Sequence, residues 1–295
     1  MKILILGGNG QVGWELQRSL AALGEVAAVD RRQADLADAE SLRHALRNFT
    51  PEVIVNAAAY TAVDKAESEP DLAYRINAIA PSVMADEAKS TGAWLVHYST
   101  DYVFDGRQEI SYTEADATGP LSVYGRTKLE GERLIQASGC KALIFRTSWV
   151  YAARGNNFAK TMLRLAKERG QLQIVSDQWG APTSAELIAD ITAQALHQAM
   201  QKPELAGLYH LTADGATTWH GYACHVLAQA QALGQLLKVR PSEVRAIATA
   251  DYPLPAARPK SSRLDTTKLQ NAFDLYLPAW QVHINRMLKE TLGDY

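Results

Sequence analysis

Hydrophobic positions along the chain follow two alternating periods. Short aliphatic runs are typical of strands buried on both faces of a sheet. The longer stretches between them repeat apolar residues at spacings of three and four, as amphipathic helices do. The alternation predicts strands at residues 2–6, 25–29, 53–55, 94–98 and 143–146, and helices at residues 12–23, 39–48, 71–90 and 122–137.

This order predicts an α/β fold with a doubly wound parallel sheet of the Rossmann type, since parallel strands need right-handed helical crossovers. We expect a dinucleotide-binding domain over residues 1–147. After about residue 148 the pattern loosens. Further elements are expected at residues 157–168, 172–175, 186–200, 208–211 and 280–292.

The later part of the chain predicts a smaller, mostly C-terminal substrate-binding lobe. We expect it over residues 177–203 and 233–295, with parts of 148–176 and 204–232 folding back onto the first domain. Residues 245–263 contain three prolines, so the sequence predicts an extended surface loop there.

Composition excludes several classes of protein. The 295 residues carry a net charge of −2, which supplies no basic field for nucleic acid. No apolar run is long enough to span a membrane, and the first one breaks at Gly7-Gly8, too early for a signal peptide, so we expect a cytoplasmic protein. The two cysteines, Cys140 and Cys224, are expected to be reduced, and the scattered histidines predict no zinc site.

A glycine-rich turn follows the first strand and precedes the first helix. Its glycines, Gly7, Gly10 and Gly13 among them, suit a tight turn, a close approach to a pyrophosphate and close packing of helix on strand. Asp30 closes the second strand, where a carboxylate accepts hydrogen bonds from an adenosine ribose. Arg31 and Arg32 follow and could pair with a 2'-phosphate instead, so NADH and NADPH both stay open.

Tyr124 and Lys128 stand four residues apart at the start of a predicted helix. They share one helical face, so we expect an ammonium close to the phenol that lowers its pKa from about 10. A tyrosine so tuned can exchange a proton with substrate. The same spacing also occurs as a plain surface pair, but Thr100 ends a predicted central strand where doubly wound sheets bind ligands.

These features resemble the extended short-chain dehydrogenase/reductase superfamily over nearly the whole chain. More narrowly, the sequence is similar to the dTDP-4-dehydrorhamnose reductases. The stretches that carry this likeness are GQVGWEL (residues 10–16), NAAAYTAVDKAE (56–67), STDYVF (99–104), RTSWVY (146–151), DQWGAPT (177–183), and Arg258-Pro259 followed by Ser262 to Leu264.

The resemblance implies reduction of the C4 keto group of a dTDP-4-dehydro-6-deoxy-L-hexose to dTDP-L-rhamnose, with NADH or NADPH as hydride donor. Tyr124 would give the proton, tuned by Lys128 and assisted by Thr100. Thr100, Asp101 and Trp149 would contact the hexose, although an indole such as Trp149 could equally be core. The residues implied to bind the cofactor are Gly7, Gly10, Gln11, Val12, Gly13, Asp30, Asp35, Leu36, Ala59, Tyr60, Thr61, Tyr98, Tyr124 and Lys128.

Other functions on this fold stay open. An NDP-sugar epimerase or dehydratase would use the same tyrosine and lysine but recycle its NAD. A non-catalytic regulatory or redox-sensing subunit would not need Thr100, Tyr124 and Lys128. A plain oligomerisation module would not need the glycine turn and Asp30 together. Some reductases of the family are reported to bind Mg²⁺ in dimers, which makes a homodimer and Mg²⁺ further implications. The candidate ligands are Glu15, Glu186 and Glu290, which as sequence features are ordinary solvated helix charges.

Overall fold

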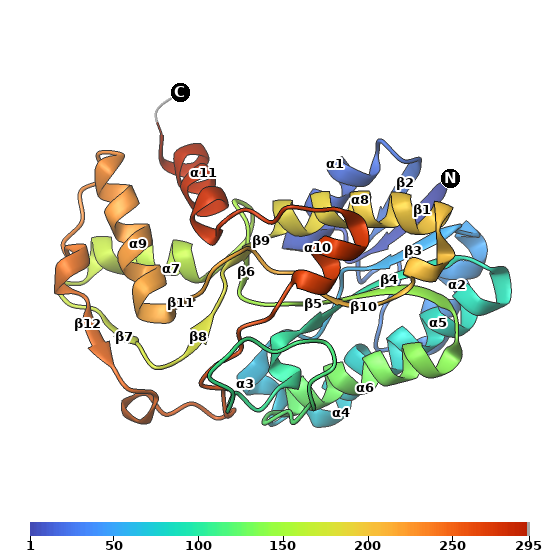
Figure 1. Cartoon of the computed structure of the whole chain (residues 1–295), viewed down its shortest axis with the longest axis horizontal. Coiled ribbons are helices and arrows are strands. Elements are labelled where there is room, and N and C mark those ends of the chain that lie inside the picture. Colours follow the sequence, from blue (N-terminus) through green and yellow to red (C-terminus); the bar gives the residue numbers. More distant parts are fainter. Residues whose placement is uncertain (294–295) are drawn as a thin grey trace.

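A computed structural model describes residues 1–293 of the chain (Figure 1). Within these residues the main sheet has six strands, all parallel, in the order β10-β5-β4-β3-β1-β2. Their bounds are β1 Lys2–Leu6, β2 Glu25–Val29, β3 Val53–Asn56, β4 Trp94–Thr100, β5 Lys141–Thr147 and β10 Gly207–His210. The predicted doubly wound fold is therefore confirmed.

The sheet lies between two layers of helices, because alternate residues of each strand face opposite sides. Ile3 and Ile5 of β1 belong to one core cluster, whereas Leu4 and Leu6 belong to the other. The first cluster includes residues of α1 and α8, and the second includes residues of α2, α5 and α6. These helices are α1 Gln11–Leu20, α8 Ala185–Gln201, α2 Ala39–Phe49, α5 Ala80–Thr91 and α6 Val123–Ser138.

The helical run predicted at residues 71–90 forms without a break at Pro81. It begins as α4 (Pro70–Tyr74), continues as a π-helical segment (Arg75–Ile79) and ends as α5. A proline ring clashes with the carbonyl four residues before it in a regular α-helix. The wider π turn ahead of Pro81 accommodates the ring, so this proline does not end the helix.

Most of the remaining elements form a smaller lobe beside the carboxyl ends of the strands (left in Figure 1). Two-residue and three-residue strands pair there as β7 with β12, β8 with β11 and β6 with β9. The helices of the lobe are α7 Phe158–Glu168, α9 Trp219–Ala232 and α11 Trp280–Leu292, whereas α10 (Thr267–Phe273) packs on β10 and α8, and short α3 (Val63–Ala66) packs on α6. The strands are β6 Val150–Tyr151, β7 Gln173–Val175, β8 Trp179–Gly180, β9 Thr183–Ser184, β11 Thr217–Thr218 and β12 Arg245–Ile247.

Two features of this lobe differ from the sequence prediction. The first is α9, which the sequence analysis did not predict. The second is the segment 245–263, predicted as an extended surface loop. It begins with a strand, β12, paired in parallel with β7, and Ser261 and Ser262 near its end are buried. The prediction was wrong at these two ends, because pairing with a distant strand and burial under other segments outweigh the local effect of the prolines. Residues 252–255 between them are exposed and lie outside helices and strands, as the sequence predicts.

The position of α8 bears on the division into domains. Ser19 of α1 donates a hydrogen bond to the carbonyl of Ala189 in α8 (3.0 Å), and Arg18 pairs with Asp190 (2.8 Å). We therefore propose that α8 belongs to the sheet domain, although the sequence assigned 177–203 to the lobe. Residues 294–295, at the end of that predicted lobe, lie outside the described residues.

Two smaller expectations concern membranes and thiols. Among residues 1–293 no helix combines the length and the apolar character needed to cross a bilayer. Cys140 and Cys224 are free thiols, and both are half-buried.

Candidate active site

The glycine turn joins β1 to α1 as the sequence predicts. Gly7 has φ +83°, which favours glycine, and its N–H donates to the Val29 carbonyl (2.9 Å). A Cβ on Gly13 would lie 2.2 Å from the Gly7 carbonyl oxygen, so only glycine lets the helix lie this close to the turn. The free N–H groups at the start of α1 provide an anion site.

A cavity of about 630 Å³ opens beside this turn at the ends of β1 and β2. Two ion pairs lie on its wall: Arg32 with Asp30 (2.8 Å) and Arg31 with Asp35 (3.3 Å). The Arg32 guanidinium holds the pKa of Asp30 below its usual value. The predicted cofactor residues that line this cavity are Gly7, Gly10, Asp30, Asp35, Leu36, Ala59, Tyr60 and Thr61.

A second cavity of about 720 Å³ continues from the first, because Gly7, Gly10 and Ala59 line both. It reaches the ends of β4 and β5 and the start of α6. The other predicted residues that it brings together are Gln11, Val12, Thr61, Tyr98, Thr100, Asp101, Tyr124, Lys128 and Trp149. The two cavities thus form a continuous groove that contains the predicted cofactor and hexose residues, with Gly13 packed behind it.

Tyr124 lies deep in this groove, and its pKa differs from the prediction. Burial raises the pKa of the phenol to about 12, although its contact with the Thr100 hydroxyl acts in the opposite direction. The expected lowering of the pKa by Lys128 is therefore wrong for the protein without ligands. The phenol carries its proton at neutral pH, which suits a proton donor.

Lys128 is fully buried and points at β4 rather than at the phenol. Its Nζ donates to the Tyr98 carbonyl (2.5 Å) and lies 3.3 Å from Nε2 of His97. Burial lowers the pKa of Lys128 to about 8, and the nearby Glu132 carboxylate acts in the opposite direction. The i, i+4 spacing puts Tyr124 and Lys128 on the same face of α6. The polar contacts of the two side chains, however, are made with residues of β4.

Asp101 follows β4 and is buried beside Thr100. The Thr100 hydroxyl donates to Asp101 Oδ1 (3.0 Å) and accepts from the Tyr102 N–H. Burial raises the pKa of Asp101 to about 7, against the effect of the Ser262 and Thr100 hydroxyls. A carboxyl group that titrates near neutral pH therefore adjoins the tyrosine, as is common in active sites.

Trp149 faces the groove and is not core. It lies in the left-handed region with φ +48°, a strained backbone for a bulky residue. Its ring stacks on Trp219, the first residue of α9, with centroids 3.6 Å apart. Gly180 makes room for the indole, because a Cβ there would come within 2.5 Å of it. Trp219 was missed by the sequence analysis together with α9.

A third cavity, of about 790 Å³, lies between α7, β7 and the segment after β12, and Trp219 lines it as well as the groove. Apolar residues of α7 and β7 line it together with Arg169 and Arg258. Arg258 makes a bidentate ion pair with Asp64 of α3 (2.7 and 3.0 Å), which connects the small lobe to the sheet domain. The sequence analysis did not predict this cavity. Its only signals were the DQWGAPT and Arg258-Pro259 stretches.

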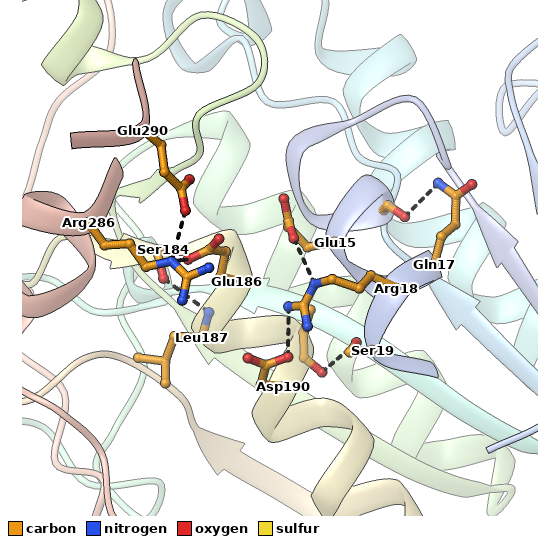
Figure 2. A network of polar contacts seen from close by, with 12 residues as sticks. Glu15, Gln17, Arg18, Ser19, Ser184, Glu186, Leu187, Asp190, Arg286 and Glu290 are labelled. Carbon is orange, nitrogen blue, oxygen red and sulfur yellow. Dashed lines mark hydrogen bonds and ion pairs between the residues drawn. The ribbon is translucent and has the colours of Figure 1, made fainter. Parts of the chain in front are cut away.

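The three glutamates considered for Mg²⁺ meet on one face formed by α1, α8 and α11 (Figure 2). Arginines are interleaved with them: Arg18 pairs with Glu15 (3.4 Å), and Arg286 pairs with Glu186 (3.6 Å) and Glu290 (3.0 Å). In the described part of the chain, no three acidic, histidine or cysteine residues form a group able to hold a metal. Mg²⁺ is not supported here, because each carboxylate already has an arginine partner.

Comparison with known proteins gives the family. The model of the RmlD substrate binding domain family matches residues 1–292. The chain belongs to this family. It is 55% identical over 294 residues to the dTDP-4-dehydrorhamnose reductase of Salmonella typhimurium and 54% identical to that of Escherichia coli K12, with 98% of each chain covered.

Solved structures agree with this membership of the RmlD family. A dTDP-4-dehydrorhamnose reductase from Bacillus anthracis in complex with NADP superposes with a TM-score of 0.88 at 34% identity, covering 98% of this chain and 99% of that one. A UDP-glucose 4-epimerase from Thermus thermophilus in complex with NAD gives a TM-score of 0.76 over both whole chains at 19% identity. The epimerase likeness concerns the fold alone.

Proposed function

We propose that the protein is a nicotinamide-dependent reductase that converts dTDP-4-dehydrorhamnose to dTDP-L-rhamnose. The observation that carries this proposal is the position of a protonated, half-buried Tyr124 beside Thr100, in a groove that starts at a glycine turn and a helix N-terminus. The identity of 55% over 98% of a relative named for this reaction supports the substrate class.

The residues of the groove account for the proton that the reaction needs. A nicotinamide supplies hydride to the C4 carbonyl carbon when it is bound. Tyr124 gives its proton to the oxygen that becomes an alkoxide, and Thr100 lies beside the phenol to orient the same oxygen. A phenol with a pKa of about 12 holds its proton at neutral pH, so it is available as the donor.

The third cavity is the proposed site of the nucleotide half of the substrate. Trp219 lines both this cavity and the groove, so a hexose under Tyr124 can extend into it. The apolar wall of Phe158, Met162 and Ile174 suits a thymine ring, and the guanidinium groups of Arg169 and Arg258 suit a diphosphate. The stacked Trp149 and Trp219 offer an indole surface for the apolar side of a deoxysugar.

For the cofactor we propose that both NADH and NADPH are accepted. Asp30 would bind the ribose hydroxyls, while the Arg32 side chain, which is 89% exposed, has room to turn from Asp30 to a 2'-phosphate. The Bacillus anthracis relative is described in complex with NADP, which supports the second of these.

The test follows the absorbance of the reduced nicotinamide with dTDP-4-keto-6-deoxy-L-lyxo-hexulose, in separate runs with NADH and NADPH. We expect one cofactor oxidised for each sugar reduced. An epimerase or dehydratase would change the sugar without net loss of reduced cofactor. A regulatory subunit would bind cofactor and leave both reactants unchanged, and either result would overturn the proposal.

A further inference from the structure

A chain of three buried polar side chains lies behind the groove, beneath Lys128. Asn56 ends β3, His97 lies in β4, and Lys128 lies in the second turn of α6; each is about 1% exposed. Asn56 Nδ2 is 3.0 Å from His97 Nδ1, and His97 Nε2 is 3.3 Å from Lys128 Nζ. Asn56 and His97 do not line the groove, and His97 contacts the groove residue Lys128 directly.

The orientation of the Asn56 amide is fixed by the backbone. The Ala58 N–H, which can only donate, lies 3.2 Å from Asn56 Oδ1. The other end of the amide, Nδ2, is also a donor and faces His97 Nδ1. Nδ1 must therefore offer its lone pair, and a neutral imidazole with a free Nδ1 carries its hydrogen on Nε2.

The Nε2–H of His97 then points at Lys128. An ammonium group has three donors and no acceptor, so it would set two donors against each other at this contact. A neutral amine has two hydrogens and one lone pair. The lone pair accepts from His97 Nε2–H while one hydrogen is donated to the Tyr98 carbonyl (2.5 Å). Only the amine satisfies both contacts, and an unsatisfied buried donor is costly.

The electrostatic surroundings of Lys128 act in the same direction, because burial lowers the pKa of the lysine to about 8. Burial also keeps the pKa of His97 well below its ordinary value, and any charge on Lys128 lowers it further, so the imidazole is neutral. Glu132 favours the charged lysine, but it is engaged by Arg146 of β5 in a buried bidentate pair (3.0 and 2.7 Å). The titratable and charged groups around Lys128 are thus His97 on β4, Glu132 on α6, Arg146 on β5, and Tyr124 and Asp101 in the same groove.

We propose that Asn56 and His97 are positioning residues that fix the Nε2–H tautomer and thereby favour the neutral amine form of Lys128 over the ammonium. Its kinetic consequence rests on the proposed reductase function, but the arrangement of hydrogens does not. The pair sets how readily the lysine gains the charge that would stabilise a phenolate at Tyr124 after the proton has left.

The first test is nitrogen NMR of the whole protein labelled with ¹⁵N-histidine, with His97→Gln to identify the His97 signals. We expect Nδ1 without and Nε2 with a hydrogen, unchanged from about pH 5 to about pH 9, because the ring cannot gain a second proton in this setting. A hydrogen on Nδ1, or on both nitrogens, would overturn the proposal. This readout needs neither substrate nor cofactor, so failure of the reductase assay leaves it valid.

The second test uses Asn56→Asp to reverse the direction of the hydrogen bonds that link Asn56, His97 and Lys128. A carboxylate accepts where the amide donated, so the hydrogen of His97 moves to Nδ1 and the Nε2 lone pair faces an ammonium. We expect the pKa of Lys128 to rise by at least one unit, about tenfold in its protonation equilibrium. It is measured from the ¹³Cε shift of labelled lysine, with Lys128→Met to identify the signal.

Asn77→Asp is the matched control. Asn77 is equally buried but bonds Tyr60 and Thr127, outside the chain of three. It should move the lysine pKa less than Asn56→Asp does. Equal shifts in the two variants, or a folded Asn56→Asp protein with an unchanged lysine, would contradict the proposal. If the reductase assay succeeds, the alkaline limb of kcat/KM should move to higher pH in Asn56→Asp, with KM for the sugar unchanged.

Discussion

An aspartate lies at each end of the groove, and the pKa values of the two carboxyl groups shift in opposite directions. At the adenosine end, Asp30 lies at the surface beside Arg32, which lowers the pKa of its carboxyl. At the catalytic end, Asp101 is buried with hydroxyl neighbours and no arginine among the causes of its shift, and its pKa rises to about 7. The comparison teaches that burial and charged neighbours, more than residue type, decide the pKa of a carboxyl group in this fold.

The largest expected effect lies at the catalytic end. Tyr124→Phe removes the proton donor, so kcat should fall by about 100- to 10,000-fold, the usual worth of a positioned acid. Cofactor affinity, measured by fluorescence titration, should change little. Tyr209→Phe is the control, because Tyr209 is a buried tyrosine whose hydroxyl bonds the Leu205 carbonyl outside the groove. A Tyr124→Phe protein with a near-normal rate would show that Tyr124 is not the proton donor, and the catalytic end of the groove would then not be distinguished by it.

A second prediction concerns stability and pH. The folded-state pKa of Asp101 is raised above 3.8, so the folded protein binds this proton more tightly than the unfolded chain does. Stability from this group is fully present below about pH 4 and is lost as the pH rises towards 7. Asp101→Asn removes this pH-dependent loss of the free energy of unfolding, which amounts to at most about 4 kcal/mol.

Urea unfolding at about pH 4 and about pH 8 measures this difference, with Asp30→Asn as control at the other end. Asp30 has a lowered pKa, so its loss should act in the opposite sense and weakly, because the group is solvated. If Asp101→Asn changes stability equally at both pH values, the burial of a charged carboxylate is not the cause.

A smaller effect is expected where the groove meets the third cavity. Gly180→Ala forces the Trp149 indole to move, because the new Cβ would lie 2.5 Å from it. We expect KM for the sugar nucleotide to rise by about tenfold with cofactor KM unchanged, as for a misplaced binding surface. Gly170→Ala is the matched control, since no atom lies within 4 Å of its Cβ. Equal KM values in the two variants would show that the Trp149–Trp219 stack does not bind the sugar.

The smallest effect belongs to the adenosine end. Arg32→Ala should weaken the binding of NADPH by only a few-fold and leave the affinity for NADH unchanged, because an exposed guanidinium is well screened. The difference should shrink further at high salt. A large loss of NADH affinity would mean instead that Arg32 orders Asp30 and its neighbours.

The two ends also differ in how far the sequence could predict them. The glycine turn, Asp30 and the helix that carries Tyr124 and Lys128 follow from local pattern, and strands β1 and β2 have the predicted bounds. By contrast, the apolar residues of α9, many of them small, are not confined to one face of the helix. The sequence therefore lacks the amphipathic pattern that would predict α9, and Trp219 was missed with it. β12 was missed because its partner β7 is distant in sequence.

The protonation of the site could not be predicted for a similar reason. The spacing of Tyr124 and Lys128 shows that they share a helical face, but their pKa values depend on how deeply β4 and β5 bury them. The contacts of Lys128 come from His97 and Tyr98, whose orientation no spacing reveals. Fold and residue types are therefore encoded locally, whereas charge states are set by tertiary packing.

The central claim is that hydride comes from the nicotinamide to C4 while the proton on the new hydroxyl comes from Tyr124. The most direct measurement is a single turnover with cofactor deuterated at the transferable position of nicotinamide C4, in ordinary water, followed by NMR of the product. We predict deuterium at C4 of the hexose in every product molecule, with Tyr124→Phe giving the same label at a much lower rate. Product without deuterium at C4, or with hydrogen from solvent there, would contradict the account.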